Sequence, residues 1–139
     1  MVRKPEQKLW DRWRVRTEAH CFYERVENRV QADAPDLYFA CEATRGWVEF
    51  KVGVWPKSPG KPLKLPKWTE GQRGWMRQHR KFGGIAWLVV QVGDEILVMR
   101  DYKALWAVDY GIQERVREST TILPLNAGWS DILDALTGR

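Results

Sequence analysis

Cysteine and histidine are scarce in this sequence, which has two of each among its 139 residues. Cys21 and Cys41 form no C-x-x-C pair and lie near no histidine cluster, so we expect neither a structural zinc site nor a disulfide framework. This cysteine usage favours a reducing compartment, and a cytoplasmic location is the expectation. His20 and His79 do not have the spacing of metal ligands, and we expect neither to be a general base.

Long apolar runs are also missing, both near Met1 and along the rest of the chain, so no secretion signal and no membrane contact are expected. The length fits a single domain over residues 1–139. A net charge of +5 and a pI near 9.4 favour polyanionic partners. The nine tryptophans are many for this length, and some are expected to form an exposed contact surface.

Periodicity and turn residues predict helices and strands that alternate along the chain. The predicted elements are a helix at 5–20, a strand at 21–30, an antiparallel hairpin of strands 37–41 and 47–54, a helix at 70–82 that stops at Gly83-Gly84, a buried strand at 85–92, an outer strand at 95–100, a helical stretch within 102–118 and a helix at 130–137. Four prolines make 55–69 an extended loop. The fold class expected is α/β, an α+β mixed sheet with flanking helices.

The stretch with most chemical information is residues 35–52, PDLYFACEATRGWVEFKV. Glu49 and Lys51 are two apart on a strand and therefore point to the same face. A turn centred near 43–44 would place Asp36 opposite Lys51 and diagonal to Glu49. Two carboxylates, with the backbone carbonyl of Phe50, could bind Mg²⁺ or Mn²⁺ beside a phosphodiester. A cross-strand salt bridge on a surface hairpin is the alternative interpretation.

With Pro35-Asp36 as PD and Glu49-Phe50-Lys51 as (D/E)XK, the segment resembles the PD-(D/E)XK nuclease superfamily. The stretch TEGQRGWMRQHRKFGGIAWLVVQV is similar to its VRR-NUC and archaeal Holliday-junction-resolvase-like branches, and the resemblance covers residues 18–100. It implies a restriction-endonuclease-like αβββαβ core, with Asp36, Glu49, Lys51 and Gln72 as catalytic residues and Asp36 and Glu49 as metal ligands.

Two assignments stay open within this resemblance. Thr69-Glu70-Gly71-Gln72 also fits a capping box, so Gln72 could cap the helix, act in the site, or do both. Members of the superfamily often carry a further glutamate on the first helix. Glu18 is the first candidate for that role and Glu27 the second, while solvated surface glutamates are the alternative.

Positive charge is concentrated between Lys51 and Lys81, where nine basic residues and one acid give +8, against −3 for the rest of the chain. Such a segment, interleaved with tryptophans, predicts a surface that follows phosphates and stacks bases. A solvated loop and helix face is the alternative. The predicted DNA-binding residues are Lys57, Lys61, Lys64, Lys67, Trp68, Arg73, Arg77, Arg80 and Lys81.

These features together predict a Mg²⁺- or Mn²⁺-dependent DNA endonuclease that is selective for branched DNA and has no organic cofactor. The resemblance implies a homodimer and a role in recombination, repair or DNA processing. The chain's size suggests a phage or mobile element, in which case it would act in the host cytoplasm. The alternatives are an exonuclease or restriction-like nuclease on the same fold, a non-catalytic nucleic-acid-binding protein, and a basic scaffold protein.

Overall fold

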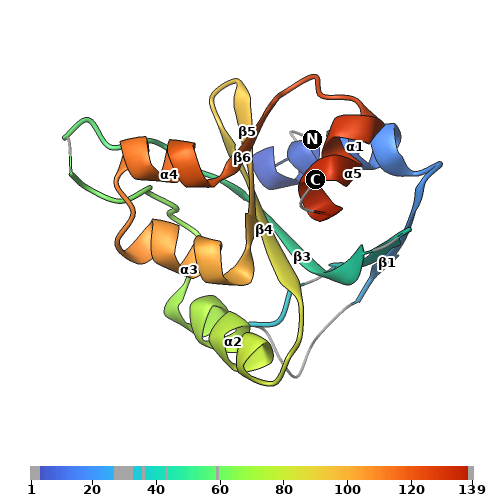
Figure 1. The fold of residues 1–139 in the computed structure, drawn as a ribbon, viewed down its shortest axis with the longest axis horizontal. Coiled ribbons are helices and arrows are strands. Elements are labelled where there is room, and N and C mark those ends of the chain that lie inside the picture. Colours follow the sequence, from blue (N-terminus) through green and yellow to red (C-terminus); the bar gives the residue numbers. More distant parts are fainter. Residues whose placement is uncertain (1–3, 27–32, 36, 43, 59, 138–139) are drawn as a thin grey trace.

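A six-stranded sheet runs through the middle of the molecule, and its strands lie side by side in chain order (Figure 1). The computed structural model describes residues 4–26, 33–35, 37–42, 44–58 and 60–137. The strands are β1 (Cys21–Arg25), β2 (Leu37–Cys41), β3 (Thr44–Val52), β4 (Ala86–Val92), β5 (Glu95–Arg100) and β6 (Thr121–Pro124). The helices are α1 (Pro5–Thr17), α2 (Glu70–Lys81), α3 (Asp101–Asp109), α4 (Gln113–Ser119) and α5 (Trp129–Thr137).

The sheet is mixed because one connection crosses over it. β3 and β4 are parallel and are joined through α2, while the other neighbouring strands are antiparallel. Six of the seven β4 residues are buried, as expected for an apolar strand that is covered on both faces. The mixed α/β fold and the order of its first six elements, αβββαβ, are thus confirmed.

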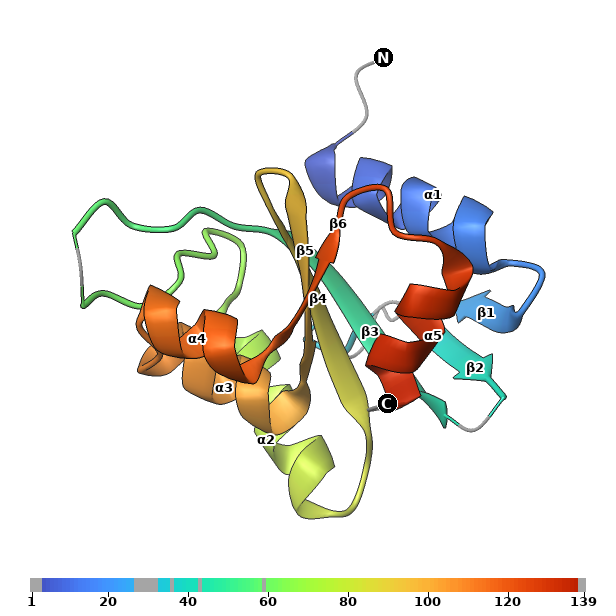
Figure 2. The ribbon, with the colours of Figure 1, turned by 45° about the horizontal axis from the view of Figure 1, so that its top comes forward.

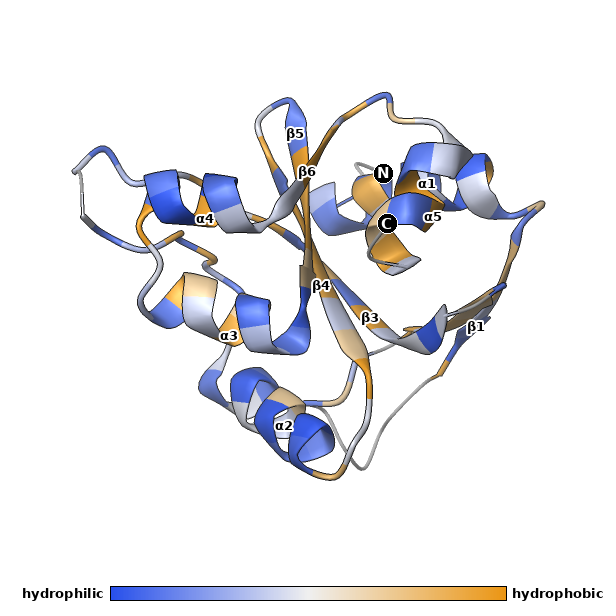
Figure 3. Cartoon of the chain, viewed as in Figure 1, coloured by the Kyte–Doolittle hydropathy of each residue, from blue (hydrophilic) through white to orange (hydrophobic). Residues whose placement is uncertain are grey.

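Helices cover both faces of the sheet (Figures 1 and 2). On one face α1 and α5 enclose a core that includes Leu9, Trp13 and Ile132. On the other face α2, α3 and α4 bury Met76 and Val116 against β4 and β5. Hydrophilic residues dominate α2 and α4 in Figure 3, so only a narrow side of each of these helices is apolar.

One prediction about the sheet was wrong, and two features were not predicted. β5 is not an outer strand: it lies between β4 and β6, with its four central residues buried. β6 itself was not predicted, and neither was the break that divides 102–118 into α3 and the start of α4. The sequence signal fails here because β6 has four residues and gains its burial from contacts with β5 and α5.

The β2–β3 hairpin differs in register from the prediction by two residues. Leu37 pairs with Val48 and Cys41 with Thr44, so two residues form the connection instead of the predicted five. Glu42 has a left-handed φ of 37°, which permits the tight turn. A shift of two residues leaves every side chain on its expected face.

Cys21 and Cys41 form a disulfide, contrary to the expectation from the sequence. They are directly paired across β1 and β2, with 4.4 Å between their Cα atoms. The bond therefore depends on a strand pairing between residues 20 positions apart, which cysteine spacing does not reveal.

No helix in the described part of the chain has the length and apolar character needed to cross a bilayer.

Candidate active site

Glu49 and Lys51 lie side by side on the face of β3 that is turned toward α2. Lys51 Nζ is 3.3 Å from Glu49 Oε1 and donates a hydrogen bond of 2.9 Å to the backbone oxygen of Lys67. Only 8% of the Lys51 side chain and 15% of the Glu49 side chain are exposed. The prediction that they share a face is confirmed, and the buried ammonium is fixed by two oxygen partners.

A pocket of about 480 Å³ opens over this pair. Its walls come from the start of α1, the facing ends of β1 and β2, the middle of β3, and the first turn of α2. The lining residues are Lys4, Glu6, Gln7, Trp10, Arg25, Leu37, Val48, Glu49, Phe50, Lys51, Lys67 and Gln72. Three of the predicted catalytic residues, Glu49, Lys51 and Gln72, are thus brought together in one hollow.

Asp36 lies outside the described residues. Its sequence neighbour Leu37 pairs with Val48 and lines the pocket. Phe50 lines the pocket too, while its ring packs against Trp10 and Trp13 with centroid distances of 5.6 and 5.7 Å. The role of the Phe50 carbonyl as a metal ligand stays a prediction.

Glu6 is a pocket residue that the sequence analysis missed. It lies in the first turn of α1 and forms an ion pair of 3.5 Å with Lys67 through Oε1. Its second oxygen, Oε2, is buried and has no hydrogen-bond partner within the described part of the chain. The first helix does place a glutamate at the pocket, and its position in the helical first turn after Pro5 was the available signal.

Of the two glutamates named from the sequence, Glu18 is described by the structure, and it does not line the pocket. Glu18 caps the C-terminal end of α1, 56% of its side chain is exposed, and it pairs with Arg14 at 3.1 Å. Twelve residues separate it from Glu6, which corresponds to about 18 Å along a helix. Glu27 lies outside the described residues.

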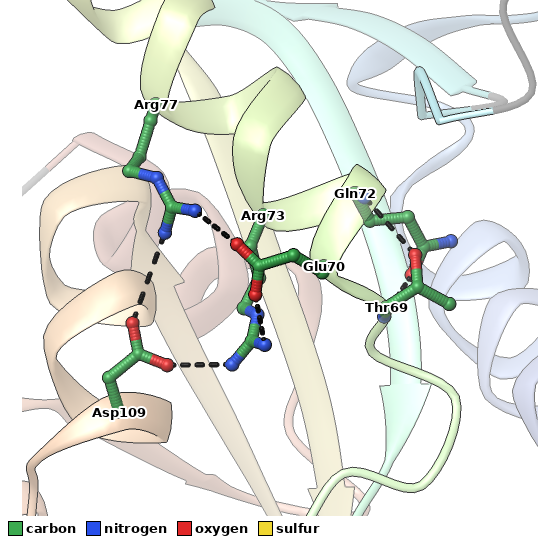
Figure 4. A network of polar contacts seen from close by, with 6 residues as sticks. All are labelled: Thr69, Glu70, Gln72, Arg73, Arg77 and Asp109. Atoms are coloured by element: carbon green, nitrogen blue, oxygen red, sulfur yellow. Dashed lines mark hydrogen bonds and ion pairs between the residues drawn. The ribbon is translucent and has the colours of Figure 1, made fainter.

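Gln72 has the capping role that its sequence context suggests. Its backbone N–H donates to Thr69 Oγ1, and its Oε1 accepts from the Thr69 N–H, both at 3.1 Å (Figure 4). This capping box is complete, yet Gln72 also lines the pocket. Its Nε2 takes no part in either bond, so capping does not prevent the amide from acting as a donor toward the pocket.

The arginines of α2 share one face, as their spacing predicts, but that face meets α3. Arg73 and Arg77 both pair with Glu70 and Asp109 (Figure 4), and Arg80 lies 3.5 Å from Asp101. The hydrogen bond from Arg77 and the positive charge of Arg73 lower the pKa of Glu70. Much of the positive charge of this face is therefore balanced within the protein.

The lysines of the loop before α2 are less constrained. Lys57, Lys61, Lys64 and Lys67 are all exposed, and the loop beneath them is anchored by the buried side chains of Leu63 and Leu65. Trp68, which the sequence suggests as a base-stacking platform, is only 7% exposed and belongs to the core under α2. Its ring does not reach the surface, because the proline-rich loop folds back onto β3.

Oxygen donors suited to a hard divalent cation converge in the pocket. Glu49 and Glu6 provide carboxylates. Glu6 Oε2 is buried and accepts no hydrogen bond from the described residues. Among the described residues, no group of three or more His, Cys, Asp or Glu is close enough to form a complete site. Ions such as Mg²⁺ bind through one or two carboxylates and keep waters, so the residues present fit such an ion.

Comparison with known proteins identifies the fold. The structure is similar to that of Hjc, a Holliday junction resolvase from the archaeal hyperthermophile Archaeoglobus fulgidus, with a TM-score of 0.54 and 14% sequence identity. The match covers 86% of this chain and 96% of the resolvase chain. The sequence matches no family model and no curated protein. The chain therefore has the same fold as Hjc.

Proposed function

We propose that this protein is a metal-dependent DNA endonuclease that cleaves branched DNA such as a four-way junction. The observation that carries the proposal is the pocket in which Glu6, Glu49, Lys51 and Gln72 meet, on a fold that resembles a junction resolvase. Acidic side chains beside a buried lysine have little use in a protein that merely binds phosphates. This favours catalysis over passive binding of nucleic acid.

Glu49, Glu6, Asp36 and the Phe50 carbonyl would hold Mg²⁺ or Mn²⁺. When bound, such an ion neutralises phosphodiester charge and lowers the pKa of a coordinated water. Lys51 is held by Glu49 and the Lys67 carbonyl. An ammonium has three donors, so one N–H of Lys51 can be directed at the attacking water or a phosphate oxygen. The Gln72 amide would orient the same phosphate.

Basic residues surround this pocket and suit a nucleic-acid strand. Lys4, Arg25 and Lys67 line it together with the two glutamates. The exposed lysines 57, 61 and 64 continue the positive surface along the loop. We propose that the loop lysines supply most of the phosphate contacts, because the α2 arginines are already paired with acids.

Cleavage of a junction requires two symmetric cuts, so we propose a homodimer, as the resemblance to resolvases implies. A source in a phage or mobile element and an affinity to the VRR-NUC branch are parts of the same proposal.

The test is cleavage of four-way junction, fork, flap, duplex and single-stranded DNA with Mg²⁺ or Mn²⁺. Asp36→Asn, Glu49→Gln and Lys51→Ala should each lower the cleavage rate by about 100-fold or more, since each removes a group that stabilises developing charge. Junction binding should persist in all three. Glu118→Gln, an exposed change outside the pocket, is the matched control. If wild-type protein cuts none of the substrates with either metal, the proposal fails.

A further inference from the structure

One face of α2 carries a stripe of rings and amides that leads away from the pocket. Gln72, Trp75, His79 and Phe82 follow one another at spacings of three and four, which places them on one side of the helix. Beyond Gln72 they line a hollow of about 450 Å³. We call this hollow the aromatic groove, and its residues are Trp75, Gln78, His79, Phe82 and Gly84.

The walls of the aromatic groove are ordered by ring contacts. His79 stacks on Trp75 with centroids 4.6 Å apart and planes 17° apart, and Trp75 meets Trp47 edge-on at 6.2 Å. A Cβ at Gly84 would lie 2.3 Å from His79 Cε1, so glycine preserves the space beside the imidazole. Partial burial lowers the pKa of His79, against the opposing charge of Asp101.

Phe82 forms the open side of the groove and is 81% exposed. Its apolar surface is unburied, so stacking against a flat ring of a ligand would stabilise it. Lys81 Nζ lies 5.8 Å from the centre of this ring, whereas Arg77 and Arg80 on the neighbouring face are paired with acids. A cation beside an apolar hollow suits an anionic strand that carries flat bases.

The groove lies next to the candidate active site. Trp47 precedes Glu49 and Lys51 by two and four residues on β3, so all three point to the same face. Gln72 lines the pocket and Gln78 lines the groove, and six helical residues span about 9 Å. This is about three nucleotides' rise in a duplex.

We propose that the aromatic groove binds an unpaired nucleobase of the DNA strand whose phosphate enters the pocket. The base stacks against Phe82 and the Trp75–His79 pair, and the Gln78 amide hydrogen-bonds its edge. This inference rests on the proposed nuclease function and extends it to substrate choice. Bases are unpaired at forks, flaps and strained branch points and paired within duplexes, so the groove makes the enzyme selective for branched DNA.

The test compares binding of a fork and of a fully paired duplex of equal length, by fluorescence anisotropy in EDTA at one salt concentration. Phe82→Ala should weaken fork binding by about 5-fold to 150-fold, the usual range for loss of one stacked base, and leave duplex binding unchanged. Phe82→Trp, which keeps an aromatic ring, should bind the fork as wild type does. Tyr110→Ala is the matched control, since this tyrosine is 78% exposed and lies outside the groove. A 2-aminopurine at the unpaired position should be quenched by wild type and less by Phe82→Ala.

Equal affinities of Phe82→Ala and wild type for the fork would overturn the inference, as would an equal loss on fork and duplex. If light scattering gives Phe82→Ala a different molar mass in solution from wild type, the groove is a contact between copies of the chain instead. If wild type cleaves branched DNA while Phe82→Ala behaves like wild type, the groove inference alone fails. If wild type neither binds nor cleaves DNA, the nuclease proposal fails with it.

Discussion

Lys51 shows how a buried charged residue is stabilised by its neighbours. Burying an ammonium is costly unless it is paired and hydrogen-bonded. Glu49 and the Lys67 carbonyl meet this need for two of its donors. The same contacts restrict the rotamers of the side chain, so the ammonium has a fixed position in the pocket.

Glu6 is the residue whose role is most directly open to test. Glu6→Gln should lower the cleavage rate at limiting Mg²⁺ by about 10- to 100-fold, because a carboxylate that lines the pocket loses its charge. Glu18→Gln, on the same helix but exposed and paired with Arg14, should leave the rate unchanged. Rates measured across a Mg²⁺ titration give the comparison. Equal behaviour of the two variants would remove Glu6 from the site.

At the scale of elements, α2 has a different partner on each side. Met76 faces the core, the Arg73 and Arg77 side pairs with Asp109 of α3, and the Gln72 side faces the pocket and the aromatic groove. The capping box fixes the first turn on which Gln72 lies. The packing of α2 and its capping box therefore determine together where the Gln72 amide lies.

The Cys21–Cys41 disulfide joins the edge strand β1 to β2, whose other end contributes Leu37 to the pocket. Closing a loop of this length stabilises a protein by about 3 kcal/mol in the chain-entropy view. Reduction should lower the free energy of unfolding, measured in urea, by about that amount. Cys21→Ala should start from the lower value and not respond to reductant. Identical urea curves for the wild type with and without reductant would contradict a stabilising role.

At the scale of the whole molecule, positive charge gathers on the loop between β3 and α2. Lys57 and Lys61 line a second hollow against α4, while Lys67 lines the pocket. One loop thus carries cations from the candidate active site to the hollow beside α4, a path that a DNA arm could follow.

The salt dependence of DNA affinity tests whether these lysines contact phosphates. Changing Lys57 and Lys61 to Ala should weaken DNA binding and make the slope of log K against log salt shallower by about 2, because each lost phosphate contact changes it by about 0.9. The control changes Arg12 and Arg45, exposed and outside both hollows, to Ala. Affinity measured at several salt concentrations distinguishes the two. The loop would not be a phosphate-binding surface if both double variants kept the wild-type slope.

Local signals in the sequence determined much of the fold. The alternation on β3 put Glu49 and Lys51 on one face, the T-x-x-Q motif predicted the capping box of α2, and the apolar run predicted β4. These features depend on residues within a few positions of each other, so the sequence alone predicts them. The αβββαβ order followed from them.

Tertiary structure alone decided which distant residues meet. It placed Glu6 and Glu49 in one pocket and joined Cys21 to Cys41. It buried Trp68 and paired arginines of α2 with Asp109 and Asp101. It also set the hairpin register and placed β5 inside the sheet. Each of these results depends on how elements far apart in the chain pack. The free energy gained by burial or pairing depends on both contacting segments. No single stretch of sequence contains that information.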